Sequence, residues 1–172
     1  MPPVFSVLTA LLLAISAGPT AYAACPAEIP THFVPDDTGL VHDTRTQLTW
    51  QRCSVGVTWS AEQGCAGGEP AMLNLDDAHA AAHEAGTGWR LPTLDELGSL
   101  VVPDCTPAAL DDRIFPDVAD LGDGIPYWSD TATPIAEPLK MHYYLDFSDG
   151  SVDIHTTGFP LAVRLVRDGV SP

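Results

Sequence analysis

Positively charged residues are scarce in this chain of 172 residues. Seven Lys and Arg stand against 23 Asp and Glu, which gives a formal net charge of −16. Such a field repels the phosphate backbone of nucleic acids, and it also disfavours anionic lipid surfaces and sulfated glycans. We therefore expect no nucleic-acid partner, while cations, neutral sugars and basic proteins remain open. Most of the acidity is explained by the solubility that an exported protein needs.

Several motifs that carry catalysis or bind metals are also absent. The chain has no Cys-x-x-Cys pair, which argues against zinc ribbons and thioredoxin-type redox chemistry. It has no Gly-x-Ser-x-Gly elbow, no His-Glu-x-x-His helix and no EF-hand loop. No spacing singles out two carboxylates as a general acid and base. We therefore expect neither an enzyme nor any catalytic residue, and no cofactor apart from a calcium ion considered below.

A long uncharged apolar run occurs only at the start of the chain. Residues 4–17 carry no charge, and Ala21-Tyr22-Ala23 follows as a small-x-small cleavage pattern. The run is shorter than the roughly 20 residues that a transmembrane helix needs. We predict a signal peptide over residues 1–24 and a single mature domain over 25–172, and no membrane span. The protein is then exported, to the periplasm, the cell surface or the medium; a buried N-terminal helix is the alternative.

The cysteines are few and even in number, namely Cys25, Cys53, Cys65 and Cys105. In an exported chain this predicts two disulfides, with three possible connectivities. A Cys53–Cys65 bridge would close a local turn-rich segment, which leaves Cys25 to pair with Cys105. Lipidation of Cys25 is an alternative, because the residue follows Ala23-Ala24. It is disfavoured because Tyr22 stands where lipoprotein signals prefer an aliphatic residue, and because Cys105 would be left unpaired.

Hydrophobic patterning predicts strands on both sides of two short helices. Residues 40–53 form a β-hairpin pattern, and Asp149-Gly150 marks a second hairpin between residues 142–147 and 151–155. The alternation in residues 161–167 predicts a last strand. Residues 54–70 and 102–126 are rich in turn formers and are predicted to be loops. The order of elements indicates an α+β fold with a compact antiparallel sheet.

Both helices have clear start signals. Asn74 caps a predicted helix that ends at Gly86, with an apolar stripe that contains Leu75, Ala78, Ala82 and Ala85. Thr93 and Glu96 form a capping box that starts the second helix, and Pro92 keeps the preceding residue extended. Arg90 lies just before this helix start. With so few cations among so many carboxylates, we expect Arg90 to meet an internal Asp or Glu rather than a ligand.

Two metal sites deserve consideration. His79 and His83 are four residues apart on the first helix with Asp76 one turn earlier, but a zinc site needs at least three well-placed ligands. The acidic loop residues Asp117, Asp120 and Asp123 invite a calcium hypothesis, since calcium binds several converging oxygen ligands. At the first place we favour histidines on the half-exposed polar flank of the helix, beside its apolar stripe. At the second we favour solvated loop carboxylates, with calcium as the alternative.

Aromatic and acidic residues alternate in two stretches, a predicted short strand at residues 127–131 and the predicted strand at 142–147. Trp128 is followed by Asp130, and Tyr144 by Asp146. An aromatic ring can stack on the face of a sugar, while a neighbouring carboxylate accepts hydrogen bonds from the hydroxyl groups of that sugar. These four residues are therefore the candidate ligand-binding residues, although core packing explains most tryptophans and tyrosines of such a chain.

The motifs together resemble a known family. In order, they are GLVHDTRTQLTWQRCSVG, GWRLPTLDEL, IFPDV, YWSDT, YLDFSDGSV and AVRLVR, spread over about residues 33–168. This series resembles the Lcl C-terminal-domain family, a bacterial domain of unknown function named after a collagen-like adhesin. The resemblance implies an exported α+β domain with a C-type-lectin-like architecture. The glycosaminoglycan binding of that adhesin is not carried over, because a chain of net charge −16 opposes sulfated polysaccharide.

The function expected from these observations is non-catalytic binding. We expect a disulfide-stabilised domain of the bacterial envelope or surface that binds a saccharide or a protein. One alternative is an envelope enzyme, because formylglycine-generating enzymes share the lectin-like fold, although their chemistry needs reactive cysteines. The other is a structural domain stabilised by calcium.

Overall fold

The architecture is known from a computed structural model that describes residues 32–103, 105, 108–118, 122, 124–134 and 138–169. The predicted signal peptide lies outside these residues, as do Cys25, Asp120 and Asp123. The described residues form three antiparallel sheets and two short helices, which confirms a mostly-β α+β fold. The compact sheet of the prediction is thus divided into three, and the C-type-lectin-like architecture stays a prediction.

The largest sheet has four strands in the order β1–β2–β3–β9. Their bounds are Phe33–Pro35 for β1, Leu40–Asp43 for β2, Leu48–Gln51 for β3 and Val166–Asp168 for β9. The predicted hairpin is present as the antiparallel pair β2–β3. Val41, Trp50 and Val166 lie opposite one another and are completely buried. One face of this sheet therefore covers the core.

A second, two-stranded sheet replaces a predicted loop. Residues 54–70 were expected to be irregular, but β4 (Val57–Ser60) and β5 (Gly64–Gly68) form an antiparallel hairpin. The prediction was wrong because three glycines in β5 remove the alternating side chains from which a strand is recognised. Cys53 and Cys65 form a disulfide that attaches this hairpin to the chain just after β3.

The third sheet has the order β6–β7–β8, with bounds of Pro126–Ala132, Met141–Asp146 and Ser151–Thr156. The predicted hairpin at Asp149-Gly150 joins β7 to β8, and Gly150 adopts a φ of 80°. Glycine suits this turn because a side chain disfavours positive φ. The register of β6 against β7 shifts between Trp128 and Ala132, so β6 bulges next to the predicted ligand residue Asp130.

The two helices begin as predicted. α1 (Leu75–Glu84) is capped by Asn74, whose side chain accepts from the Asp77 amide, and it buries Leu75, Ala78 and Ala82. α2 (Leu94–Gly98) begins with the complete capping box of Thr93 and Glu96 and packs against β6 and β7. Neither helix of the described residues is long and apolar enough to cross a membrane.

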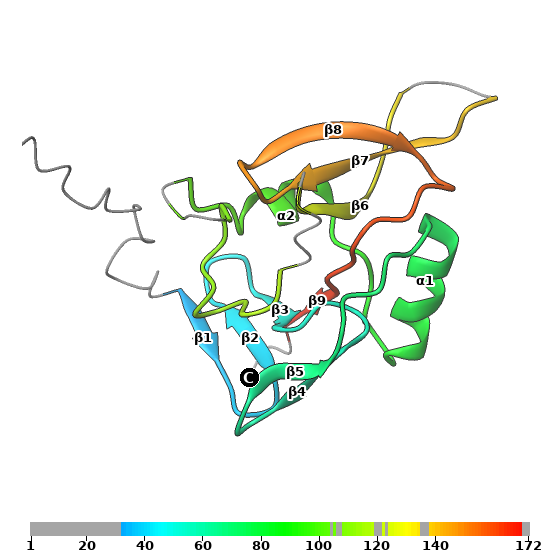
Figure 1. Ribbon diagram of the computed structural model, residues 1–172. Coiled ribbons are helices and arrows are strands. Elements are labelled where there is room, and N and C mark those ends of the chain that lie inside the picture. Colours follow the sequence, from blue (N-terminus) through cyan, green and yellow to red (C-terminus); the bar gives the residue numbers. More distant parts are fainter. Residues whose placement is uncertain are drawn as a thin grey trace, which may run out of the picture.

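The segment 161–168 differs from its prediction. Only Val166–Asp168 is a strand, and residues 161–166 are all buried instead of alternating between core and solvent. Figure 1 shows why: after β8 the chain runs back through the middle of the molecule to β9. Leu161, Val163 and Leu165 pack in the cluster that contains α1, whereas Ala162 and Val166 pack in the cluster of the four-stranded sheet. The side chains do alternate in direction along this segment, but both sets of side chains are buried, each in a different hydrophobic cluster.

Candidate functional site

Arg164, in this central segment, is completely buried within a polar network. Its guanidinium donates to the backbone oxygens of Gln51, Arg52 and Asp117, to Ser54 Oγ, and to Asp117 Oδ1 at 3.1 Å. It also lies over the rings of Phe115 and Tyr127. A buried charge is tolerated only when it is paired and hydrogen-bonded, and both conditions hold here.

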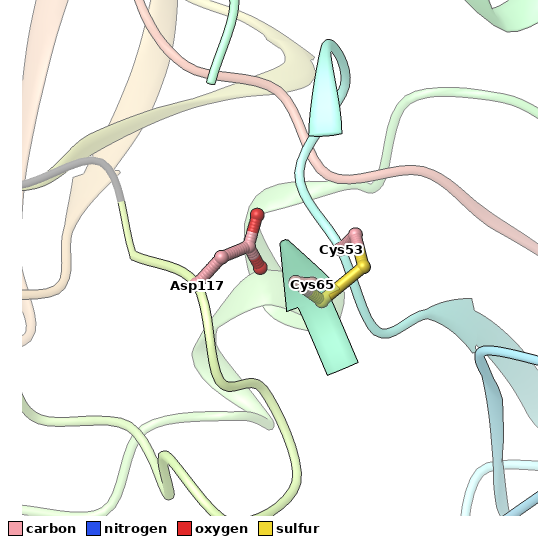
Figure 2. Close-up of side chains that lie close together, drawn as sticks. All are labelled: Cys53, Cys65 and Asp117. Carbon is pink, nitrogen blue, oxygen red and sulfur yellow. A yellow bond between two sulfur atoms is a disulfide. The ribbon is translucent and has the colours of Figure 1, made fainter. Parts of the chain in front are cut away.

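Asp117 completes this network from the other side. Its Oδ2 accepts from the Ser54 amide at 2.6 Å, so both carboxylate oxygens are bound by protein donors. The carboxylate lies beside the Cys53–Cys65 disulfide (Figure 2). These three residues are the one group of His, Cys, Asp and Glu in the described residues that is close enough to share a metal ion. Disulfide sulfurs are not thiolates, so in this form the group holds the loop at residues 114–118 rather than a metal.

The predicted ligand residues have different surroundings in the fold. Trp128 is completely buried, and its Nε1 donates to the Leu73 oxygen at 2.8 Å. Tyr144 lies opposite Trp128 and packs against the same cluster. Burial, followed by the nearby charges of Asp153 and Asp146, raises the pKa of Tyr144 above its ordinary value. Asp146, the last residue of β7, accepts from the amides of Ile125 and Ser148, so its carboxylate is bound by the backbone just before β6 and in the turn that follows β7.

Asp130 is the one of these residues that joins an exposed site. Its Oδ1 lies 3.1 Å from Nε2 of His79 on α1, and both side chains are about half exposed. His142 on β7 lies near this pair. Burial, which outweighs the opposing effect of Asp130, lowers the pKa of His142 below its ordinary value of 6.5. The spacing of His79 and His83 suggested that these two histidines act together on the helix. In the structure, the partner of His79 is instead Asp130 on β6.

A hollow of about 520 Å³ adjoins this pair. It is lined by both histidines of α1 and by the segment after the helix, with Gly86, Thr87, Gly88, Trp89 and Arg90. Gly86 and Gly88 have positive φ values and open space where a side chain would be, so the backbone is accessible there. The side chain of Arg90 is fixed by two bonds to Glu96, at 2.8 and 2.7 Å, and by one to Asp168. This confirms the expectation that Arg90 meets internal carboxylates.

Trp89 links this hollow to the outer face of the four-stranded sheet. Its half-buried ring lies under the guanidinium of Arg167, with 4.6 Å from Cζ to the ring centroid. Arg167 in turn lines a second hollow of about 470 Å³, together with His42 and Thr49 of the neighbouring strands. A second such stack, Arg52 over Trp59 at 4.3 Å, lies beside a smaller hollow of about 270 Å³.

Sequence patterns did not single out Trp89 and Arg167 as site residues. Trp89 belongs to a segment that is recognisable as a helix start, and Arg167 to one that is recognisable as a strand. Their stack joins residues 78 positions apart, so no local spacing signals it. The one signal in the sequence was that Trp89 directly follows Gly86-Thr87-Gly88, a turn-forming stretch at the end of the predicted helix.

The comparison with known protein families agrees with these elements. A family model described as Lcl C-terminal domain matches residues 39–167, which is more than half of the chain. The match begins just before β2 and ends within β9, and it includes the disulfide, both helices and the Trp89 hollow. A comparison with curated proteins found no match. The chain belongs to the Lcl C-terminal domain family.

Proposed function

We propose that this protein is a non-catalytic binding domain of the bacterial cell envelope or surface, and that its ligand is a saccharide held in the Trp89 hollow. The observation that carries the proposal is the combination of a half-buried indole with imidazole, guanidinium and backbone groups around about 520 Å³. Binding pockets for small polar ligands have this composition, an apolar surface with a few convergent polar groups.

The chemistry of the hollow fits an uncharged sugar. A pyranose has an apolar face that packs on an indole and an edge of hydroxyls that need donors and acceptors. Arg90 is held by Glu96 and Asp168, and His79 by Asp130, so these polar groups are oriented before a ligand arrives. The net charge of −16 disfavours sulfated glycans, which leaves neutral ones.

Export and the lack of catalysis are supported by the cysteines. Cys53 and Cys65 are joined, and Cys105 is also disulfide-bonded, which indicates an oxidising compartment. None of these sulfurs can act as a thiolate nucleophile in this form. That chemistry is what the enzyme alternative on a lectin-like fold requires.

Binding of neutral oligosaccharides by the purified chain tests the proposal. We expect saturable binding to at least one glycan on an array, and at least a roughly tenfold weaker affinity for Trp89→Ala in calorimetry. Trp59→Ala is the matched control, because it removes a second half-buried, arginine-stacked tryptophan outside this hollow.

Two results would contradict the proposal. One is the absence of binding to every neutral glycan by a chain whose native disulfides are verified by mass. The other is a glycan affinity that Trp89→Ala and Trp59→Ala reduce equally, because the ligand would then not be held in the Trp89 hollow.

A further inference from the structure

Arg167 differs from every other arginine of the chain. In the part of the chain that the structure describes, the guanidinium groups of the others donate to backbone oxygens or carboxylates; these are Arg45, Arg52, Arg90, Arg113 and Arg164. Among the described residues, Arg167 stacks on the ring of Trp89, and its guanidinium forms no hydrogen bond or ion pair; its Nε is buried without a partner, as is that of Arg164. The other nitrogens of Arg164 donate to protein oxygens, whereas those of Arg167 do not. A half-buried charge without an acceptor is costly, so the retention of Arg167 needs an explanation.

The surroundings of Arg167 form a row across the whole sheet. Val34, His42, Thr49 and Arg167 lie opposite one another on β1, β2, β3 and β9. All four line the hollow of about 470 Å³ on the face of the sheet that does not cover the core. The row thus places a guanidinium, a hydroxyl and an imidazole side by side on rigid strands, where each can donate to one ligand.

The acidic groups near this row are already bound. Asp36 lines the same hollow, but its Oδ1 accepts from the amides of Thr38 and Leu40 and both oxygens accept from Thr38 Oγ1. Asp168, the neighbour of Arg167, accepts from Arg90. Neither carboxylate reaches the guanidinium of Arg167, whose charge is therefore available to a ligand.

We propose that the Arg167–Thr49–His42 row is a recognition site for a carboxylate group, separate from the saccharide hollow, which shares no lining residue with it. The planar guanidinium binds a carboxylate through two parallel hydrogen bonds, and stacking on Trp89 fixes its plane in advance. Thr49 and His42 then bind the remaining part of the ligand.

The charge of the protein selects among anions. A carboxylate carries one negative charge, whereas phosphate monoesters and oligosulfates carry two or more. In a molecule of net charge −16 each further charge adds repulsion from Asp36 and Asp168, while the row has one guanidinium to offset it. The site therefore takes monocarboxylates, of which a sugar acid and the C-terminus of a peptide are the two sources that reach a surface hollow.

Paired probes test this site on the full chain. We expect saturable amide shifts at Thr49, His42 and Arg167 in two-dimensional NMR with sodium galacturonate, and none with galactose at the same concentration. A second pair, N-acetyl-dialanine and its amide, separates the sources: a shift with the free acid alone identifies a peptide C-terminus. Binding by galacturonate alone identifies a sugar acid, and binding by both identifies the carboxylate itself.

Variants separate the role of the charge from that of the fold. Arg167→Gln should weaken the affinity for the carboxylate probe by at least roughly tenfold, since a charge-assisted bidentate contact is lost. Arg45→Gln, which removes a guanidinium that donates to the Ser99 oxygen and does not line the hollow, should leave binding of the carboxylate probe unchanged. The comparison of probes on the wild-type chain does not depend on whether a variant folds. If no carboxylate probe shifts the amide signals of Thr49, His42 and Arg167, or if galactose shifts them equally, the site is refuted. Loss of neutral-glycan binding by Trp89→Ala is a separate readout, so either proposal can fail alone.

Discussion

Arg164 and Asp117 form a buried ion pair, with 3.1 Å between Nη2 and Oδ1, that joins the centre of the molecule to the loop at residues 114–118. The guanidinium is fully enclosed, and the carboxylate side chain is 9% exposed. Sequence patterns assigned neither residue this role: Asp117 suggested calcium, and Arg164 lay within the predicted last strand. The pair shows that the loop is attached by a charge network as well as by the packing of Ile114 and Phe115.

Removing one partner of this pair should destabilise the fold strongly. Arg164→Met removes the guanidinium that donates to Asp117 Oδ1 and Ser54 Oγ and leaves the buried carboxylate without its counter-charge, so the unfolding free energy should fall by about 3–5 kcal/mol. Asp117→Asn keeps an acceptor and should cost less. Urea unfolding of both variants beside Arg45→Met measures the difference. A loss in Arg164→Met no larger than in Arg45→Met would show that the network contributes nothing to stability.

The Cys53–Cys65 disulfide should contribute as a short loop closure. The two cysteines are 12 positions apart, and closing a loop of this length stabilises by about 3 kcal/mol in the chain-entropy model. The double variant Cys53→Ala/Cys65→Ala should therefore unfold at a lower denaturant concentration than the wild type, with the β4–β5 hairpin exchanging its amides first. Alkylation of the folded, unreduced protein should find neither thiol free; labelling at Cys53 or Cys65 would contradict the bridge.

Glu96 makes stability depend on pH in the acid range. Burial raises its pKa, but the hydrogen bonds from Arg90 and Thr93 and the charge of Arg90 together lower the pKa below its ordinary value of 4.5. Because the pKa is depressed in the folded state, the ionised carboxylate stabilises the fold above pH 4.5, and this contribution is lost as the pH falls below that value.

Glu96→Gln tests this dependence. The substitution should cost about 1–2 kcal/mol at pH 7, and the difference from wild type should shrink by pH 3. Glu62→Gln, at an exposed turn, is the matched control and should show no such change. A cost for Glu96→Gln that stays constant from pH 7 to pH 3 would mean that its charge does not stabilise the fold.

The local elements of this protein could be read from short stretches of its chain. Asn74, Thr93 and Glu96 cap helices through groups three residues apart, and Asp149-Gly150 turns a hairpin within four residues. The Arg90–Glu96 pair spans six positions. Each of these depends on backbone hydrogen bonding or on neighbours in sequence, so the pattern contains the whole interaction.

The candidate sites were decided by tertiary structure alone. Trp128 had the pattern of a ligand residue, but it is buried because β6 lies between both cores, and Arg164 is enclosed because the chain returns through the middle of the molecule. The partners His79 and Asp130, like Trp89 and Arg167, lie on different elements. The proximity of these partners follows from how the sheets and the helix pack. An alternating sequence pattern predicts that one face of a strand is buried, but it does not say whether the other face meets water or a second core.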